Sequence, residues 1–246
     1  FYLDPKYFNL SLENIFSDSW QMITDMNIFQ SGNIYPFTFL PDSLNEPLLL
    51  IQNSNKIHCC SNVCTHRAHL VSTKHCHGTK LRCKYHGRTF NIDGSFNFMP
   101  GFDEVNNFPT DNDNLSSVPC KNWENLIFVS LTGLLDITPV LKDIKNRIPN
   151  YPFSKLVLDK NHSQEWEINA HWALYCENFL EGFHVPYVHQ GLAKEINLSN
   201  YQTILIDNGV LQLATGKEKF DVFLNNSNPD ETIYGLYYWI FPNIML

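Results

Sequence analysis

Two short segments, each with a closely spaced cysteine and histidine, constrain this chain more than any other feature. The first reads CTHRAH at residues 64–69, and the second reads CKYHGRTF at residues 83–90. Thiolate and imidazole groups are the usual protein ligands of structural zinc and of some iron–sulfur clusters. The two segments therefore predict a metal centre bound by Cys64, His66, Cys83 and His86.

The pairing of these ligands along the sequence separates the two kinds of centre. Structural zinc sites usually pair cysteine with cysteine and histidine with histidine. Here each segment pairs one cysteine with one histidine, so each loop can give one ligand to each iron of a two-iron, two-sulfide cluster. Imidazole in place of thiolate on one iron raises the reduction potential. The pattern favours an electron-transfer cluster, with structural zinc as the alternative.

Composition bounds the classes of function. A chain of 246 residues with 43% hydrophobic residues can bury a packed core. The net charge of -8 and the lack of a Lys/Arg cluster along the sequence argue against nucleic-acid binding. The longest apolar segments, 46–52 and 237–246, are shorter than the roughly 20 residues that span a bilayer. We expect no nucleic-acid or membrane partner.

Two further features concern the compartment and the chain ends. The seven cysteines are odd in number, and two of them, Cys59 and Cys60, are adjacent. This is a poor basis for a disulfide framework, so we expect a reducing, cytoplasmic location and small buried thiols at both positions. The chain ends at Leu246 within an apolar, strand-prone run, and we expect it to be a fragment of a longer protein.

Local patterns predict strands between two helical regions. Residues 35–120 read as short strands, with a hairpin at Asp93-Gly94, and a second hairpin is expected at Asn208-Gly209. We expect one helix after an N-cap at Ser11, and two more over 138–148 and 170–183. The third helix should bury its aromatic residues, which are Trp172, Tyr175, Phe179 and Phe183.

A second group of chemically active residues lies at the end of the third helix. At helical spacing, Glu177, Glu181 and His184 fall on one face, and His189 follows a proline at the helix end. Two imidazoles and one carboxylate are the ligand set of mononuclear non-heme Fe(II), which leaves positions open for O2 and substrate. A solvated polar stripe is the alternative, although the apolar residues around these groups favour burial.

These residues carry a family resemblance. CTHRAH and CKYHGRTFNIDGSF resemble the two cluster loops of Rieske non-heme iron oxygenases, in which the second loop often reads C-x-Y-H-G-W-x-F-x-x-x-G. NAHWALYCENFLEGFHVPYVH, at residues 169–189, resembles the catalytic motif of the same family. Arg88 departs from the usual Trp, which would affect packing and potential but not ligation. His171 and Ala173 also depart from a common N-W-K run.

The resemblance implies the architecture and the cofactors. It implies an α+β fold in which an all-β Rieske [2Fe-2S] module, 35–122, follows an N-terminal segment, 1–34, that packs on the catalytic domain. Residues 123–246 would form an incomplete catalytic domain of the mixed α/β, START-like helix-grip type. The cofactors would be a [2Fe-2S] cluster at Cys64, His66, Cys83 and His86, and a mononuclear Fe(II).

The resemblance also assigns the iron site. His184 and His189 would bind the iron, and Glu181 would be the catalytic acid that links an iron histidine to the cluster histidine His86 of a neighbouring subunit. The third iron ligand would be an Asp or Glu beyond Leu246. Three carboxylates in loop-like sequence are not nominated for this role: Asp221, Asp230 and Glu231.

The implied activity is oxygenation of a small organic substrate with O2. Electrons would come from a flavin-dependent reductase, with or without a ferredoxin, so that NAD(P)H acts only indirectly, and transfer between subunits implies a homotrimer. The motifs favour hydroxylation or oxidative demethylation of a quaternary amine such as choline, betaine or carnitine. Its cation could be cradled by Trp166, Tyr175, Tyr187 and Trp239. The alternatives are an arene-ring dioxygenase α subunit, a Rieske electron carrier without oxygenase activity, and a zinc-stabilised binding module.

Overall fold

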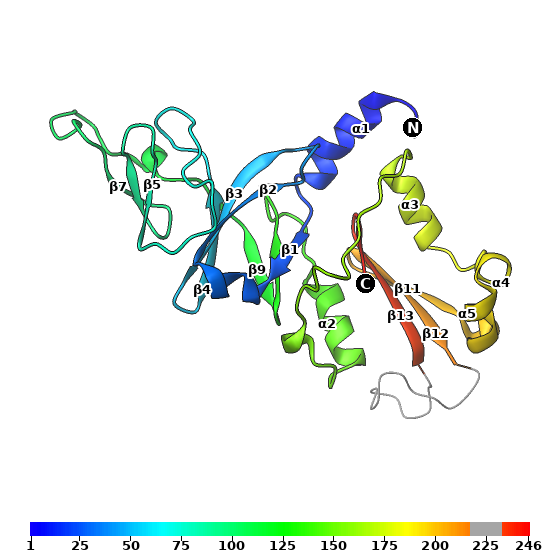
Figure 1. Cartoon of the computed structure of the whole chain (residues 1–246). Coiled ribbons are helices and arrows are strands. Elements are labelled where there is room, and N and C mark those ends of the chain that lie inside the picture. The colour runs from blue at the N-terminus through cyan, green and yellow to red at the C-terminus, as the bar shows by residue number, and fades with distance from the viewer. Residues whose placement is uncertain (217–232) are drawn as a thin grey trace. The chain divides into compact units, whose positions relative to one another are not determined.

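The computed structural model describes residues 1–216 and 233–246 and separates the chain into two compact units. The β unit is Met22–Gly133, and the mixed unit joins Phe1–Gln21 to Leu134–Leu246. Figure 1 shows that the β unit consists mainly of strands, whereas the mixed unit combines helices with an antiparallel sheet. The expected α+β class is confirmed, and the strand-rich segment is inserted into the chain of the mixed unit.

The β unit contains three small sheets. The first has the strand order β2-β3-β4-β8, formed by Ile34–Phe39, Glu46–Asn53, Lys56–Ser61 and Ser117–Val118. The second has the order β1-β10-β9, formed by Gln21–Asp25, Leu126–Val129 and Cys120–Trp123. The third has the order β5-β6-β7, formed by Lys80–Arg82, Thr89–Asn91 and Phe96–Phe98. Two 3-10 helices, Met26–Ser31 and Asp111–Asp113, complete the unit.

Strand β3 is central because both of its faces are covered. Residues 48–51 are fully buried, and alternate side chains enter two different cores. Its neighbour β4 alternates in the same way, so Cys60 joins the core that contains Cys64 and Cys83, whereas Cys59 joins the other core. The expected small buried thiols at Cys59 and Cys60 are confirmed.

The β unit extends beyond the predicted segment 35–122 at both ends. Strand β1 lies before that segment and β10 after it, and the two strands are neighbours in one sheet. The predicted N-terminal segment 1–34 is therefore divided between the units at Gln21. Pairing between strands so far apart in sequence leaves no local pattern from which the boundary could be predicted.

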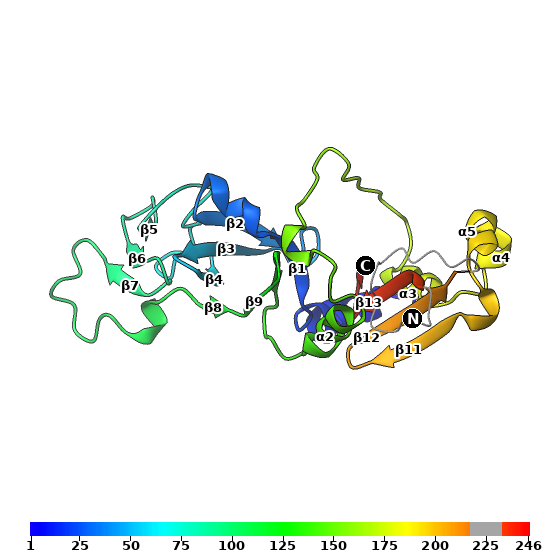
Figure 2. The same ribbon diagram turned by 90° about the horizontal axis from the view of Figure 1, so that it is seen from below.

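The mixed unit begins with α1 (Pro5–Ser11) and a π-helical turn (Leu12–Phe16). It continues with α2 (Thr138–Arg147), a 3-10 helix (Phe153–Lys155), α3 (Trp172–Phe179), α4 (Val185–Val188), α5 (Gln190–Glu195) and a second 3-10 helix (Leu198–Asn200). Its sheet has the order β11-β12-β13-β14, formed by Gln202–Ile206, Gly209–Thr215, Ile233–Ile240 and Ile244–Met245. Figure 2 shows α4 and α5 at one end of this sheet, where Ile196 forms a bridge with Gly216.

The predicted position of the first helix is wrong. Helix α1 begins at Pro5, and the Asp4 side chain caps it by accepting a hydrogen bond from the Lys6 amide at 2.9 Å. Ser11, the predicted N-cap, is the last residue of α1, and strand β1 occupies the end of the predicted helix. Asp followed by Pro is a strong start signal, and it lies about two turns upstream of the predicted N-cap.

Helix α2 agrees with prediction, whereas α3 is shorter than predicted. Helix α3 ends at Phe179, and its one buried residue is Cys176. Tyr175 and Phe183, which were expected to be buried, are 57% and 86% exposed. The predicted burial of these two aromatic residues is wrong. The chain leaves the helix before Phe183, and Tyr175 lies on a solvent-exposed side of α3.

Both predicted hairpins form. Gly94, with φ of 89°, connects β6 and β7. In the second hairpin the turn residues are Asp207 and Asn208, because Gly209 already pairs with Ile206 in the sheet. Asn208 takes the left-handed conformation, with φ of 57°, which asparagine adopts more readily than most residues.

In the parts of the chain that the structure describes, every helix is too short or too polar to cross a membrane.

Candidate metal centres

The two Cys/His loops of the β unit share one backbone design. The Cys64 amide donates to the carbonyl of His69, five residues further on, at 2.9 Å, and the Cys64 carbonyl accepts from the Ala68 amide at 3.0 Å. Cys83 makes the same two bonds. Its amide donates to the Arg88 carbonyl at 2.9 Å, and its carbonyl accepts from the Gly87 amide at 3.1 Å. Ala68 and Gly87 both have positive φ, 51° and 76°, and so turn each loop back on its cysteine. The result is a pair of matching loops, each with a cysteine at its base.

The two cysteines meet in the core of the β unit. Cys64 and Cys83 are 3% and 2% exposed, and neither forms a disulfide. Burial raises the pKa of the Cys64 thiol, and the adjacent Cys83 raises it further. Two buried thiolates side by side would be unstable without positive charge between them. A bound metal supplies that charge, so the pair fits one iron of a cluster.

The two histidines also meet, nearer the surface. Their ring centroids are 4.7 Å apart, with an angle of 71° between the planes. The Nδ1 atom of His66 is buried and has no hydrogen-bond partner, which is rare for a polar atom unless a metal or an ion completes it. Burial, followed by the nearby His86, lowers the pKa of His66 and so favours the neutral imidazole that binds metals.

The four side chains do not surround a single point. In the described residues no group of three or more His, Cys, Asp or Glu side chains is arranged to hold one metal ion. Structural zinc needs four ligands around one ion, whereas a Rieske cluster takes two cysteines on one iron and two histidines on the other. The observed pairing of sulfur with sulfur and nitrogen with nitrogen therefore fits the cluster better than zinc.

Arg88 ties the two loops together. Its guanidinium is buried, and Nη1 donates to Thr65 Oγ1 at 2.7 Å and to Asp113 Oδ1 at 3.1 Å. Thr65, which lies between the two ligands of the first loop, donates to the Asp113 carbonyl at 2.8 Å. The rings of Phe96 and Phe108 lie 5.3 and 5.5 Å from the guanidinium carbon. Arg88 thus fills an aromatic slot and joins the second loop to the first.

The other histidines and cysteines near the loops have structural partners. The His75 ring nitrogen Nε2 donates to the Gly32 carbonyl at 3.0 Å, and Cys76 forms a backbone bridge with Ile34. The segment KHCHG, residues 74–78, is therefore held by contacts to the backbone at the start of β2. Burial raises the pKa of the Cys60 thiol to about 12, which makes Cys60 an inert core residue.

The mixed unit contains the second centre. His184 and His189 have ring centroids 5.1 Å apart and line one cavity of about 200 Å³. Glu181 lines the same cavity, and its carboxylate accepts from Nδ1 of His184 and, at 3.3 Å, from the His184 amide. A carboxylate on Nδ1 fixes the tautomer and leaves Nε2 free to bind a metal. The hydrogen bond from His184 is the main reason why the pKa of Glu181 is lowered.

The route by which these residues meet differs from the predicted one. Glu177, Glu181 and His184 do not lie on one helical face, because α3 ends at Phe179 and His184 starts α4. Glu177 remains exposed on α3 and accepts a hydrogen bond from the Tyr2 hydroxyl. Glu181 reaches His184 from the connecting loop, where its carboxylate also accepts from the Phe183 amide. The expectation of a shared helix face is wrong, although Glu181 and His184 do come together.

Three residues that sequence reasoning missed line the same cavity: Tyr201, Gln212 and Tyr237. Gln212 is 2% exposed, accepts from the Tyr201 hydroxyl at 2.9 Å and donates to the Phe179 carbonyl at the end of α3. Burial raises the pKa of Tyr201 to about 12. A glutamine inside the apolar strand VLQLA was the signal that could have located this side of the cavity.

Comparison with known proteins gives the β unit a family. Residues 19–109 match the family model of the Rieske [2Fe-2S] domain. The chain carries a Rieske domain. Its sequence is 28% identical over 235 residues to the chloroplastic choline monooxygenase of Beta vulgaris, covering 90% of this chain and 51% of that protein. It is 24% identical over 255 residues to the carnitine monooxygenase oxygenase subunit of Escherichia coli K12, covering 100% of this chain and 65% of the subunit.

Solved structures show the same fold. A quaternary ammonium Rieske monooxygenase in complex with L-carnitine superposes with a TM-score of 0.69 at 19% identity, over 96% of this chain and 62% of that chain. Naphthalene 1,2-dioxygenase from Rhodococcus sp. superposes with a TM-score of 0.70 at 17% identity, over 98% and 62%. The chain thus spans about half to two thirds of the length of the choline and carnitine monooxygenases that it matches.

The aromatic residues predicted to cradle a cation do not line the His184–His189 cavity. Asp221, Asp230 and Glu231 lie outside the described residues. Trp166 and Tyr175 line a separate cavity of about 390 Å³, and Tyr187 lines another. In the described chain, then, the aromatic residues that line the His184–His189 cavity are Phe179, Tyr201 and Tyr237.

Proposed function

We propose that this chain is part of the oxygenase subunit of a Rieske-type monooxygenase that hydroxylates or oxidatively demethylates a quaternary ammonium compound. The observation that supports this most is the presence of two separate donor sets in one chain. One set suits a [2Fe-2S] cluster, and the other pairs two histidines with a carboxylate that orients one of them. An electron carrier alone would need only the first set.

The residues of each centre have distinct tasks. Cys64 and Cys83 would hold one iron of the cluster, and His66 and His86 the other. When bound, the cluster supplies one-electron transfer, and a mononuclear iron at His184 and His189 supplies activation of O2.

Glu181 holds the Nδ1 proton of His184 and so orients the imidazole toward the cavity. Gln212 fixes the end of α3 and the Tyr201 hydroxyl on the opposite wall. Through these two hydrogen bonds Gln212 helps to position the loop that follows α3 and carries Glu181.

A quaternary ammonium substrate suits the lining of this cavity. Two tyrosine rings and a phenylalanine ring offer π faces, and Glu181 offers negative charge, which together favour a cation without hydrogen-bond donors. The names of the choline and carnitine monooxygenases support the same class. An arene dioxygenase activity is the second candidate, because the naphthalene dioxygenase fold fits equally well.

The remaining partners belong to the same proposal. A flavin-dependent reductase, with or without a ferredoxin, would supply electrons from NAD(P)H, and a homotrimer would bring His86 of one subunit to Glu181 of the next. A downstream Asp or Glu outside this sequence would complete the iron site. None of the seven cysteines forms a disulfide, which suits a cytoplasmic location.

The test uses the full-length protein, purified without added metal. We expect acid-labile sulfide and visible absorption from the cluster. With a flavin-dependent reductase and NAD(P)H as the electron source, we expect substrate-dependent O2 uptake with carnitine or choline but not with naphthalene. In the variant His184→Ala/His189→Ala we expect the cluster absorption to stay and O2 uptake to disappear. A colourless protein that contains zinc, or a double variant that keeps full turnover, would contradict the proposal.

A further inference from the structure

One face of the Rieske domain is basic although the chain as a whole is acidic. Seven Lys and Arg residues, and no Asp or Glu, lie between Glu46 and Asp93, in a chain of net charge -8. They are dispersed along the sequence, which is why no cluster was evident there. The fold gathers several of them at one cavity.

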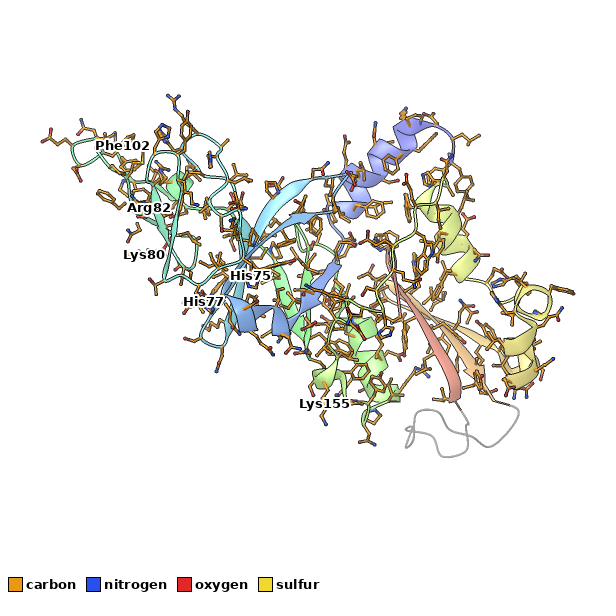
Figure 3. All side chains as sticks on the ribbon, in the orientation of Figure 1. His75, His77, Lys80, Arg82, Phe102 and Lys155 are labelled. Carbon is orange, nitrogen blue, oxygen red and sulfur yellow. The ribbon has the colours of Figure 1, made fainter. Side chains whose placement is uncertain are left out.

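Four of these residues line one cavity of about 290 Å³, and we call them the basic face: Lys74, Lys80, Arg82 and Lys84. All four are exposed. Lys80 and Arg82 lie two residues apart on β5 and point to the same side of the strand (Figure 3). In the described residues no ion pair neutralises any of the four, and the polar contact of Lys80 is to the neutral Asn97 at 2.7 Å. The face therefore has an uncompensated positive potential.

The basic face is continuous with the cluster ligands. Lys84 directly follows Cys83 in the sequence. His69 lines the same cavity, and its ring centroid is 5.6 Å from that of Tyr85. The Tyr85 ring is in turn 3.9 Å from the ring of His86. A protein bound at this face would thus lie two aromatic contacts from a histidine of the cluster.

We propose that the basic face is the docking surface for an acidic electron-donor protein. The inference rests on the proposed function, because it requires a cluster to reduce. In the docked pair, one electron leaves the reduced flavin or iron–sulfur centre of the donor and enters the cluster, so the donor is oxidised by one electron and the cluster reduced by one. A small protein is favoured over a nucleic acid because the chain's net negative charge would repel an extended polyanion outside this face.

The experiment measures the rate at which an acidic donor reduces the cluster. The probe is reduced plant-type [2Fe-2S] ferredoxin, whose potential lies below that of Rieske centres. The test variant is Lys80→Glu/Arg82→Glu. The control is Lys56→Glu/Lys155→Glu, which has the same change in net charge at two exposed residues that do not line the cavity.

At low ionic strength we expect the test variant to be reduced roughly tenfold or more slowly than the wild type, and the control to change much less. The difference in reduction rate between the test variant and the wild type should disappear at about 0.5 M salt, where charges are screened over a few ångströms. Equal rates for the test variant and the wild type would overturn the proposal. So would an equal loss in the control, or competition by duplex DNA or anionic vesicles as strong as that by polyglutamate.

Two readouts separate this proposal from the proposed function. Dithionite is a small reductant that needs no docking surface, so it should reduce the cluster in all variants alike. If dithionite reveals no cluster in the wild type, the proposed function fails. If the cluster is present and only the ferredoxin rate is insensitive to Lys80→Glu/Arg82→Glu, the docking surface alone fails. Dissociation of the oligomer in the test variant would instead assign the face to contacts between copies and overturn the proposal.

Discussion

At the scale of single residues, Arg88 shows how a buried charge is tolerated next to the cluster loops. It has an ion pair with Asp113, a hydrogen bond to Thr65 and two aromatic neighbours. Breaking a buried pair from one side leaves the other charge without a partner, which costs more than the pair contributes. Arg88 stands where the Rieske oxygenases often have Trp, and the structure shows which partners stabilise its charge.

Substitution of Arg88 by methionine tests this role. Arg88→Met should lower the free energy of unfolding by about 2 kcal/mol, because Asp113 loses its counter-charge while the aromatic slot stays filled. Urea titration of the purified protein measures it, with the exposed Lys56→Met as control. The double variant Arg88→Met/Asp113→Asn should regain part of the loss. Identical unfolding curves for Arg88→Met and the wild type would contradict the assignment.

Asp113 also predicts a pH dependence. Burial alone would raise its pKa, but hydrogen bonds from Thr110 and Arg88 bring the pKa below the usual value. A lowered pKa in the folded state stabilises the protein above the unfolded value of about 4, and this contribution is lost as pH falls through the folded value. The difference in melting temperature between wild type and Asp113→Asn should be constant above about pH 5 and shrink below about pH 4. A difference that grows in acid would refute the sign.

Glu181 contacts His184 at the cavity that is proposed to hold the mononuclear iron. Glu181→Gln keeps the shape but weakens the acceptor on Nδ1, and loss of such a partner commonly costs about 10- to 100-fold in metal affinity. Titration with Fe(II) or Co(II) measures the affinity, and the cluster absorption should not change. Glu177→Gln, on α3, is the matched control. Equal affinities for the two variants would remove Glu181 from the site.

At the scale of elements, the loop between α3 and α4 decides whether the second centre forms. The loop contains Gly182, against which the Tyr201 ring packs. A Cβ atom at Gly182 would lie 2.8 Å from a ring carbon of Tyr201. The close approach explains why a glycine is needed there, and it connects the loop to the cavity wall.

Gly182→Ala should therefore lower the free energy of unfolding by about 1–3 kcal/mol through steric overlap. Gly191→Ala, where a Cβ meets nothing within 4 Å, is the control. In a double-mutant cycle, Tyr201→Leu should cost less in the Gly182→Ala background than in the wild type, because the smaller side chain relieves the overlap. Additive costs would show that the two residues do not clash.

At the scale of the whole molecule, the two centres differ in protection from solvent. Two of the four cluster residues, Cys64 and Cys83, are almost fully buried, although His86 is exposed. At the second site neither histidine is buried, because the side chain of His184 is 23% exposed and His189 is exposed. A mild chelator should remove mononuclear iron from His184 and His189 while the cluster absorption persists. Iron analysis before and after chelation, with visible spectra, measures this. Simultaneous loss of both signals would mean that the centres are not independent.

Much of both sites was determined by the sequence because ligand chemistry belongs to individual residues. The mixed pairing at Cys64, His66, Cys83 and His86 predicted the cluster set before any fold was known, and the His184–His189 pair predicted the second centre. Spacing along a short loop limits where such side chains can lie.

Tertiary structure decided how distant segments meet. It placed Glu181 beside His184 through a loop instead of a helix face, brought Tyr201 and Gln212 into the cavity from the sheet, gave Arg88 its partner Asp113, and collected dispersed lysines and arginines into the basic face. Glu181 and His184 are only three residues apart in sequence and meet because α3 ends at Phe179. The contacts of Arg88 and Gln212 join residues that are 25 and 33 apart in sequence. Local patterns do not encode such contacts, whereas they do encode which side chains can bind a metal.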